Sequence, residues 1–140
     1  MTQQFNFQHQ KLNSSNKFVV AYHNEKPINY TFKYFNIERN NKKFYKSKSR
    51  KKEDFYQFMV GCQKICDKTW QEIRNDSQFH CHDITNGFKF TNPELQGWQP
   101  IQIKLPGMKQ GRLVGFIDEH FVFNVVKFDK EHQIYPDETR

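Results

Sequence analysis

GRLVGFIDEHFVFNVVKFDKEHQIYP, residues Gly111–Pro136, is the stretch that decides the fold of this chain. Two apolar runs, 113–117 and 121–128, flank a polar turn at 118–120, which is typical of a β-hairpin. The second run is apolar on both faces, with Phe121, Phe123 and Val125 on one and Val122, Val126 and Phe128 on the other. Because a strand with two apolar faces is usually covered on both sides, we expect it to be central in its sheet.

Other strands are predicted from alternating apolar residues on the amino-terminal side of the hairpin. IQIKL at 101–105 alternates cleanly, and FKF at 88–90 is a short strand candidate. Further upstream, 18–22 and 28–35 read as strands, the second with one aromatic face. The Gln- and Asn-rich residues 1–17 are expected to form a flexible amino-terminal arm.

The clearest predicted helix runs from Glu53 to Arg74. Apolar residues recur there at spacings of three and four, and Gly61 is a candidate point for a break into two shorter helices. The order of strands, helix and strands predicts an α+β fold, in which a curved antiparallel β-sheet packs against one or two helices. We expect one such domain over residues 18–140, with a basic loop at 39–52.

The charge of the chain favours a polyanionic partner. Its 140 residues carry a formal net charge of +7. The basic loop, RNNKKFYKSKSRKK, contains no acidic residue, and we interpret it as a phosphate-tracking segment with aromatic rings for stacking. A solvated loop and a docking strip for an acidic protein are the alternatives. The candidate RNA-binding residues are Lys42, Lys43, Lys46, Lys48, Arg50 and Lys51, with Lys127 and Lys130 near the carboxyl end.

Several classes of protein lack support in the sequence. The amino-terminal residues have no apolar signal-peptide core, and no apolar run is long enough to span a bilayer, so we expect a cytoplasmic protein with no membrane partner. The three cysteines form no secreted-type framework. A Gly-rich phosphate loop, a GxSxG elbow and an HExxH motif are all missing, which leaves nucleotidases, serine hydrolases and metalloproteases unsupported.

A polar cluster follows the last predicted strand and suits phosphate chemistry. Cleavage of RNA by its own 2′-hydroxyl needs a base, an acid and a cation for the charge that builds on the phosphate. His132 can transfer protons near neutral pH, Arg112 suits the phosphate, and Tyr135 can stack on a base or donate a proton. The alternative is structural: His132 and Tyr135 would cap the strand and pack at the sheet edge.

The segment HCHDI at 80–84 raises the question of a metal. His80, Cys81 and His82, together with Cys62 and Cys66, contain ligands that zinc accepts. Adjacent ligands are not the usual paired spacing, however, and both helical cysteines fall in the apolar stripe, so we predict no metal site. In an extended segment the two histidines share one face, where His82 is a further candidate for proton transfer, or they cap the junction between helix and strand.

With these residues in view, the chain resembles a group of small bacterial and phage-borne proteins. The resemblance rests on TWQEI at 69–73, HCHDI at 80–84, FKF at 88–90 and the block at 111–136, where Lys127 replaces the more usual Trp. The element order is also similar to that of the RelE/ParE-type toxin superfamily. Those proteins place helices against a curved antiparallel sheet and close with an Arg-bearing strand and a carboxyl-terminal His or Tyr.

The resemblance implies a metal-independent endoribonuclease toxin that cleaves mRNA, with the ribosome as the expected place of action. It assigns charge stabilisation to Arg112, proton transfer to His132, and stacking or proton donation to Tyr135. It implies no cofactor, and its expected partners are RNA or the ribosome and an antitoxin protein. The alternative function is a non-catalytic basic protein that binds nucleic acid or an acidic partner, such as an antitoxin or a phage or host factor. A zinc-stabilised structural protein is the third hypothesis.

Overall fold

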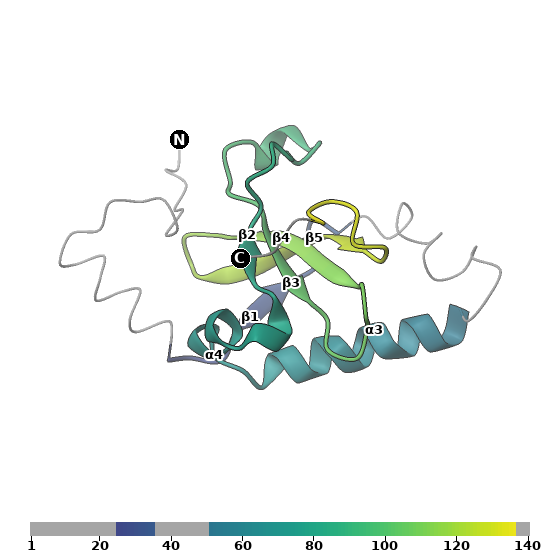
Figure 1. Cartoon of the computed structure of the whole chain (residues 1–140). Helices are drawn as coiled ribbons and strands as arrows, with labels where there is room; N and C mark the ends of the chain where they lie inside the picture. Colours follow the sequence, from purple (N-terminus) through teal and green to yellow (C-terminus); the bar gives the residue numbers. More distant parts are fainter. Residues whose placement is uncertain (1–24, 36–50, 137–140) are drawn as a thin grey trace.

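The computed structural model describes residues 25–35 and 51–136 of the chain (Figure 1). The described elements are β1 (Asn29–Thr31), α3 (Lys51–Cys66), α4 (Trp70–Asn75), η1 (Ser77–Phe79), β2 (His82–Asp83), η2 (Pro93–Leu95), β3 (Ile101–Lys104), β4 (Arg112–Ile117) and β5 (Val122–Asp129). The expected α+β class is therefore confirmed. The predicted arm at 1–17, the predicted strand at 18–22 and residues 39–50 of the basic loop lie outside the described residues.

The five described strands form one sheet in the order β1-β5-β4-β3-β2. The pairs from β2 to β5 are antiparallel, as expected, and β5 lies inside the sheet between β1 and β4. β1 pairs with β5 in parallel, so the prediction of a wholly antiparallel sheet was wrong. The long connection that separates β1 from β5 in the sequence, with α3 and α4 in it, makes this parallel pairing possible.

A β-bulge in the hairpin of β4 and β5 changes which side chains face the helices. The strand register shifts between Val114 and Gly115, and Val126 becomes the extra residue on β5. The extra residue reverses the alternation that follows it. Phe128 therefore packs in the same core as Val125, and the prediction that it shares a face with Val126 was wrong.

The sheet has two covered faces. On the first, called the helix face, α3, α4 and η1 pack over side chains of β3, β4 and β5 around Phe128, Phe123 and Ile103. On the second, called the loop face, the segment between β2 and β3 and the carboxyl-terminal residues cover Val114 and Phe116. Figure 1 shows α3 and α4 on one side of the sheet and the segment that contains η2 rising from the other. The predicted helical layer against the sheet is thus present.

The helical region breaks at a different place from the one predicted. α3 ends at Cys66 and α4 begins at Trp70, so the break lies at 67–69 and not at Gly61. Thr69 starts α4 with a capping box: its Oγ1 accepts the N–H of Glu72 at 3.1 Å, and its own N–H donates to the Glu72 carboxylate at 2.9 Å. Gly61 instead lets α3 approach the sheet, because a Cβ there would lie 2.9 Å from Leu105 Cδ2.

The FKF segment at 88–90 is not a strand, and that prediction was wrong. Asn86 organises the segment as a turn, since its Oδ1 accepts the N–H of Phe88 at 3.2 Å. Phe90 is buried in the loop-face core, so the apolar signal reflects packing rather than strand pairing. Within 25–35 and 51–136, no helix has the length and apolar character needed to cross a membrane.

The bulge generates a stability prediction at Gly115. An added Cβ would lie 1.9 Å from the backbone oxygen of Asn124, so Gly115→Ala must force β4 and β5 apart. We expect it to lower the free energy of unfolding by about 3 kcal/mol or more in urea titrations. Gly87→Ala is the matched control: its φ of 90° carries backbone strain of about 1–2 kcal/mol, but nothing lies within 4 Å. If Gly115→Ala and Gly87→Ala lower the free energy of unfolding equally, the close contact of β4 and β5 at Gly115 is contradicted.

Candidate functional site

The residues that follow β5 form a compact C-terminal turn, residues 129–136. The Asp129 carboxylate accepts two backbone N–H groups, from Gln133 at 3.0 Å and from Ile134 at 2.7 Å. His132 adopts a left-handed backbone conformation with φ of 56°, and its Nε2 lies 3.0 Å from the backbone oxygen of Tyr135. The predicted proton-transfer residue therefore helps to hold the turn.

Tyr135 anchors the C-terminal turn to the loop face. Its side chain is 7% exposed and belongs to the loop-face core. Its hydroxyl lies 3.0 Å from Thr85 Oγ1, and its backbone oxygen accepts an N–H from Gln102 Nε2 at 3.3 Å. Asn86 makes a further hydrogen bond to the turn, since its Nδ2 donates to the backbone oxygen of Ile134 at 2.7 Å.

The predicted cations of this region are packed against the protein. Arg112 is 4% exposed, lies opposite Asp129 in the register of β4 and β5, and donates from Nη1 to the backbone oxygen of Gly111 at 3.4 Å. Lys127 is half-buried on β5, opposite Val114. Lys130 forms an ion pair with Asp54 of α3, with 2.6 Å between Nζ and Oδ2. This ion pair ties the turn to the helix.

The structure brings part of the predicted catalytic set together. His82 on β2 is half-buried and pairs in register with Gln102, the residue whose side chain reaches Tyr135. The C-terminal turn therefore lies near the strand pair that carries His82. A catalytic group must reach its substrate, however, and the low exposure of Arg112 and Tyr135 favours a structural role for both.

The histidine and cysteine cluster does not converge on one point. His80 caps η1 with φ of 41°, and its ring centroid lies 6.3 Å from that of His82. Burial raises the pKa of the Cys62 thiol to about 12 and that of the Cys81 thiol to about 12, which keeps both protonated at neutral pH. Among the described residues, no group of three or more His, Cys, Asp or Glu side chains is placed to hold a metal ion.

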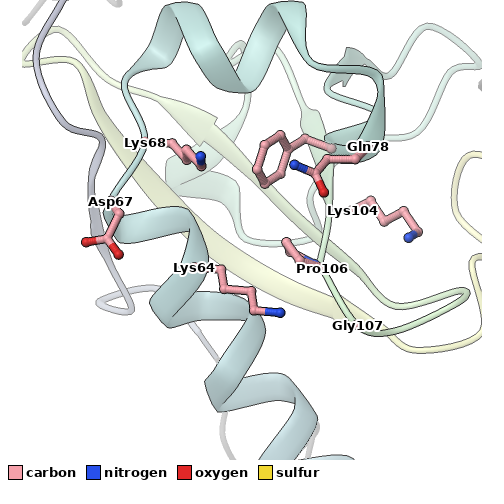
Figure 2. Close-up of a pocket in the computed structure, with 8 residues that line it drawn as sticks. Lys64, Asp67, Lys68, Gln78, Lys104, Pro106 and Gly107 are labelled. Carbon is pink, nitrogen blue, oxygen red and sulfur yellow. The ribbon is translucent and has the colours of Figure 1, made fainter.

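A second site, which sequence reasoning missed, lies on the side of the molecule where α3 ends. Three lysines from different segments line one open hollow of about 420 Å³: Lys64 in the last turn of α3, Lys68 between α3 and α4, and Lys104 at the end of β3. Figure 2 shows Lys68 and Gln78 pointing into the hollow and Asp67 directed away from it. We call this site the lysine hollow.

The fold holds the walls of the lysine hollow in place. Phe79, which is 1% exposed, packs in the helix-face core and so fixes the position of η1. Pro106 and Gly107 form the opposite rim of the hollow. The backbone oxygen of Lys68 accepts the N–H of Ile28 at 2.8 Å, which fixes the junction of α3 and α4. Because buried groups anchor these segments, the three lysine backbones cannot easily separate.

The electrostatics of the hollow favour an anion. Its lining contains three lysines and one aspartate, a formal net charge of +2. In the part of the chain that the structure describes, none of the three ammonium groups forms an ion pair. The pKa of the exposed Glu72 carboxyl is lowered chiefly by the Thr69 hydrogen bond and to a smaller degree by the positive charge of Lys68. Lys68 would therefore attract both Glu72 and a bound anion.

The sequence contained only a weak signal for this hollow. Lys64 and Lys68 are four residues apart at a helix end, which suggests a shared face, but Lys104 is distant in the chain and follows an ordinary strand pattern. The basic run at 39–52 was the stronger signal. Of its candidates, Lys51 begins α3, whereas Lys42, Lys43, Lys46, Lys48 and Arg50 lie outside the described residues.

Comparison with known proteins adds no assignment. No protein-family model matches the chain, and no curated protein or solved structure is significantly similar to it.

The C-terminal turn generates a prediction at Asp129. Asp129→Ala removes the acceptor of two backbone N–H groups on a buried residue, so we expect a loss of about 2–3 kcal/mol in the free energy of unfolding, measured by urea titration. Asp129→Asn keeps one oxygen acceptor and should lose less. The exposed Asp67→Ala is the control and should change stability by less than about 0.5 kcal/mol. If Asp129→Ala leaves the free energy of unfolding unchanged, the carboxylate does not organise the turn.

Proposed function

We propose that this chain is a nucleic-acid-binding protein and that the lysine hollow is a contact for backbone phosphates. The observation that carries the proposal is that Lys64, Lys68 and Lys104, which come from three separate segments, line one open hollow. Lysine ammonium groups bind phosphate oxygens through charge and release counterions from the polyanion. The formal charge of +7 on the whole chain supports the same class of partner.

The neutral groups of the hollow are consistent with phosphate binding. The Gln78 side chain adds an amide, whose Nε2 donates one hydrogen bond to Asp76 at 2.9 Å and has a second N–H. Phosphate contacts of this kind give affinity without reading the base sequence. We therefore expect binding that depends on salt and varies little with sequence. The lysines of the segment at 39–52 and Lys127 stay candidate contacts on sequence grounds.

The proposal predicts a change in salt dependence. In Lys64→Gln/Lys68→Gln/Lys104→Gln, the slope of log K against log salt for single-stranded RNA should become less steep by about 2, since each lost phosphate contact contributes roughly 0.7. Fluorescence anisotropy at several salt concentrations measures this slope. Affinity should fall for all RNA sequences alike.

The control is Lys33→Gln/Lys89→Gln/Lys109→Gln, which removes the same charge from three exposed lysines outside the hollow. This variant should keep most of the affinity and most of the slope. If the two triple variants bind RNA equally well, the hollow is not the contact. If the unaltered chain binds an acidic protein but no RNA, the partner class is wrong.

A second candidate is the metal-independent endoribonuclease of RelE type, a toxin that acts on mRNA. It is supported by the arrangement on the loop face, where the half-buried His132 lies in the turn beside Tyr135 and Gln102 connects this turn to the strand pair of His82. An acidic antitoxin would be the natural protein partner in that case. The low exposure of Arg112 and Tyr135 is the reason that this candidate ranks second.

The second candidate predicts cleavage of translated mRNA by the unaltered chain, together with growth arrest on expression. His132→Asn should reduce the cleavage rate by about 100-fold or more, because proton transfer by a positioned side chain contributes that much. Asn tolerates the left-handed backbone of this position, so the fall in melting temperature should be limited to the loss of the His132 contact with the Tyr135 backbone oxygen. Cleavage that is equally fast in His132→Asn removes the assigned role, and no cleavage by the unaltered chain removes the candidate.

A further inference from the structure

The charge of the lysine hollow distinguishes between two kinds of phosphate. An internal phosphodiester of a nucleic acid carries one negative charge, whereas a terminal phosphomonoester carries about −1.5 to −2 at neutral pH. The lining of the hollow has a formal charge of +2, and Asp67, its one acidic member, is directed away from the cavity in Figure 2. Because the Glu72 and Asp76 carboxylates lie just beyond this lining, the preference comes from attraction and not from equal charge: the three lysines attract a dianion more strongly than a monoanion.

The shape of the hollow leads to the same conclusion. Its lining comes from α3, from the junction before α4, from η1 and from the end of β3 with the following turn, so separate segments border an open hollow of about 420 Å³. The Lys68 ammonium and the Gln78 amide point into this space in Figure 2, and the flexible side chains of Lys64 and Lys104 can turn toward the same phosphomonoester, which has three terminal oxygens. A phosphodiester presents only two free oxygens, and both of its ester oxygens must continue into the chain.

Among the described residues, no exposed aromatic ring lines the hollow. The one aromatic lining residue, Phe79, is 1% exposed and packs with the helix-face core. The hollow therefore offers charge and hydrogen-bond donors but no ring for a nucleobase. Recognition at this place must then depend on the phosphate and not on the attached base.

We propose that the lysine hollow binds the terminal phosphomonoester of a nucleic-acid strand, through Lys64, Lys68, Lys104 and the Gln78 amide. This inference rests on the proposed function and narrows it from phosphates in general to strand ends. The same chemistry is present in free inorganic phosphate and in phosphorylated proteins. The occupant is identified as a strand end because the remaining positive charge of the chain suits the polyanion behind it.

The test compares four 12-nucleotide RNAs of one sequence in anisotropy titrations: 5′-phosphate, 3′-phosphate, both ends phosphorylated and both ends hydroxyl. We expect the unaltered chain to bind at least one singly phosphorylated RNA about tenfold more tightly than the hydroxyl form, as one added charge-assisted contact would produce. Inorganic phosphate at millimolar concentration should abolish this preference while leaving the hydroxyl form bound.

The two triple lysine variants make the test specific. The hollow variant, Lys64→Gln/Lys68→Gln/Lys104→Gln, should lose the preference for a phosphorylated end, and the control variant, Lys33→Gln/Lys89→Gln/Lys109→Gln, should keep it. Equal melting temperatures for the two triple variants exclude unfolding as the cause of a lost preference. If the hollow variant unfolds, the single variant Lys104→Gln replaces it and should weaken the preference.

The outcomes separate the inference from the proposed function. If all four RNAs bind equally and the hollow variant weakens all of them, the proposed function stands and the preference for strand ends is refuted. If the unaltered chain binds none of them, the proposed function itself fails. If only a phosphorylated peptide binds in a parallel titration, the phosphomonoester chemistry is right but the strand-end assignment is wrong.

Discussion

The close contact of β4 and β5 at Gly115 is the constraint on which the rest of the structure depends. Only a residue without a side chain fits there, because a Cβ would lie 1.9 Å from the Asn124 backbone oxygen. The bulge beside it directs Phe128 into the helix-face core, where its ring packs 4.9 Å from that of Phe58 on α3. By the same reversal, Asp129 reaches the loop face, where its carboxylate can organise the C-terminal turn.

The same framework produces two polar regions with different properties. In the C-terminal turn, polar groups are paired within the protein: His132 with the Tyr135 backbone, the Tyr135 hydroxyl with Thr85, and Lys130 with Asp54. In the lysine hollow, ammonium groups from three segments line an open space. Groups that are already satisfied stabilise a fold, whereas like charges held together by the core favour an external anion. This contrast is why we propose that binding occurs at the lysine hollow.

The sequence predicted those features that depend on local patterns. The hairpin of β4 and β5, the strand at 101–104 and the α+β class follow from alternation, turn residues and helical spacing. The bulge at Val126 could not be predicted, because it inserts one extra residue into β5 without changing the apolar composition of the strand. As a result, the sequence placed Phe128 on the wrong face of the sheet. The parallel partner of β1 and the approach of Lys104 to Lys64 arise from long-range packing, which residue spacing does not encode. Tyr135 was predicted as a site residue from its polar hydroxyl, and in the structure this hydroxyl contacts Thr85 while the side chain is buried.

Mapping of backbone amide chemical shifts during titration with 5′-phosphorylated single-stranded RNA tests whether the lysine hollow is the place where the nucleic acid binds. We predict that the largest shift changes occur at Lys64, Lys68, Gln78 and Gly107, around the lysine hollow. We also predict that amides of the C-terminal turn, residues 129–136, change little. Changes centred on that turn and on His82, with none around the hollow, would contradict it.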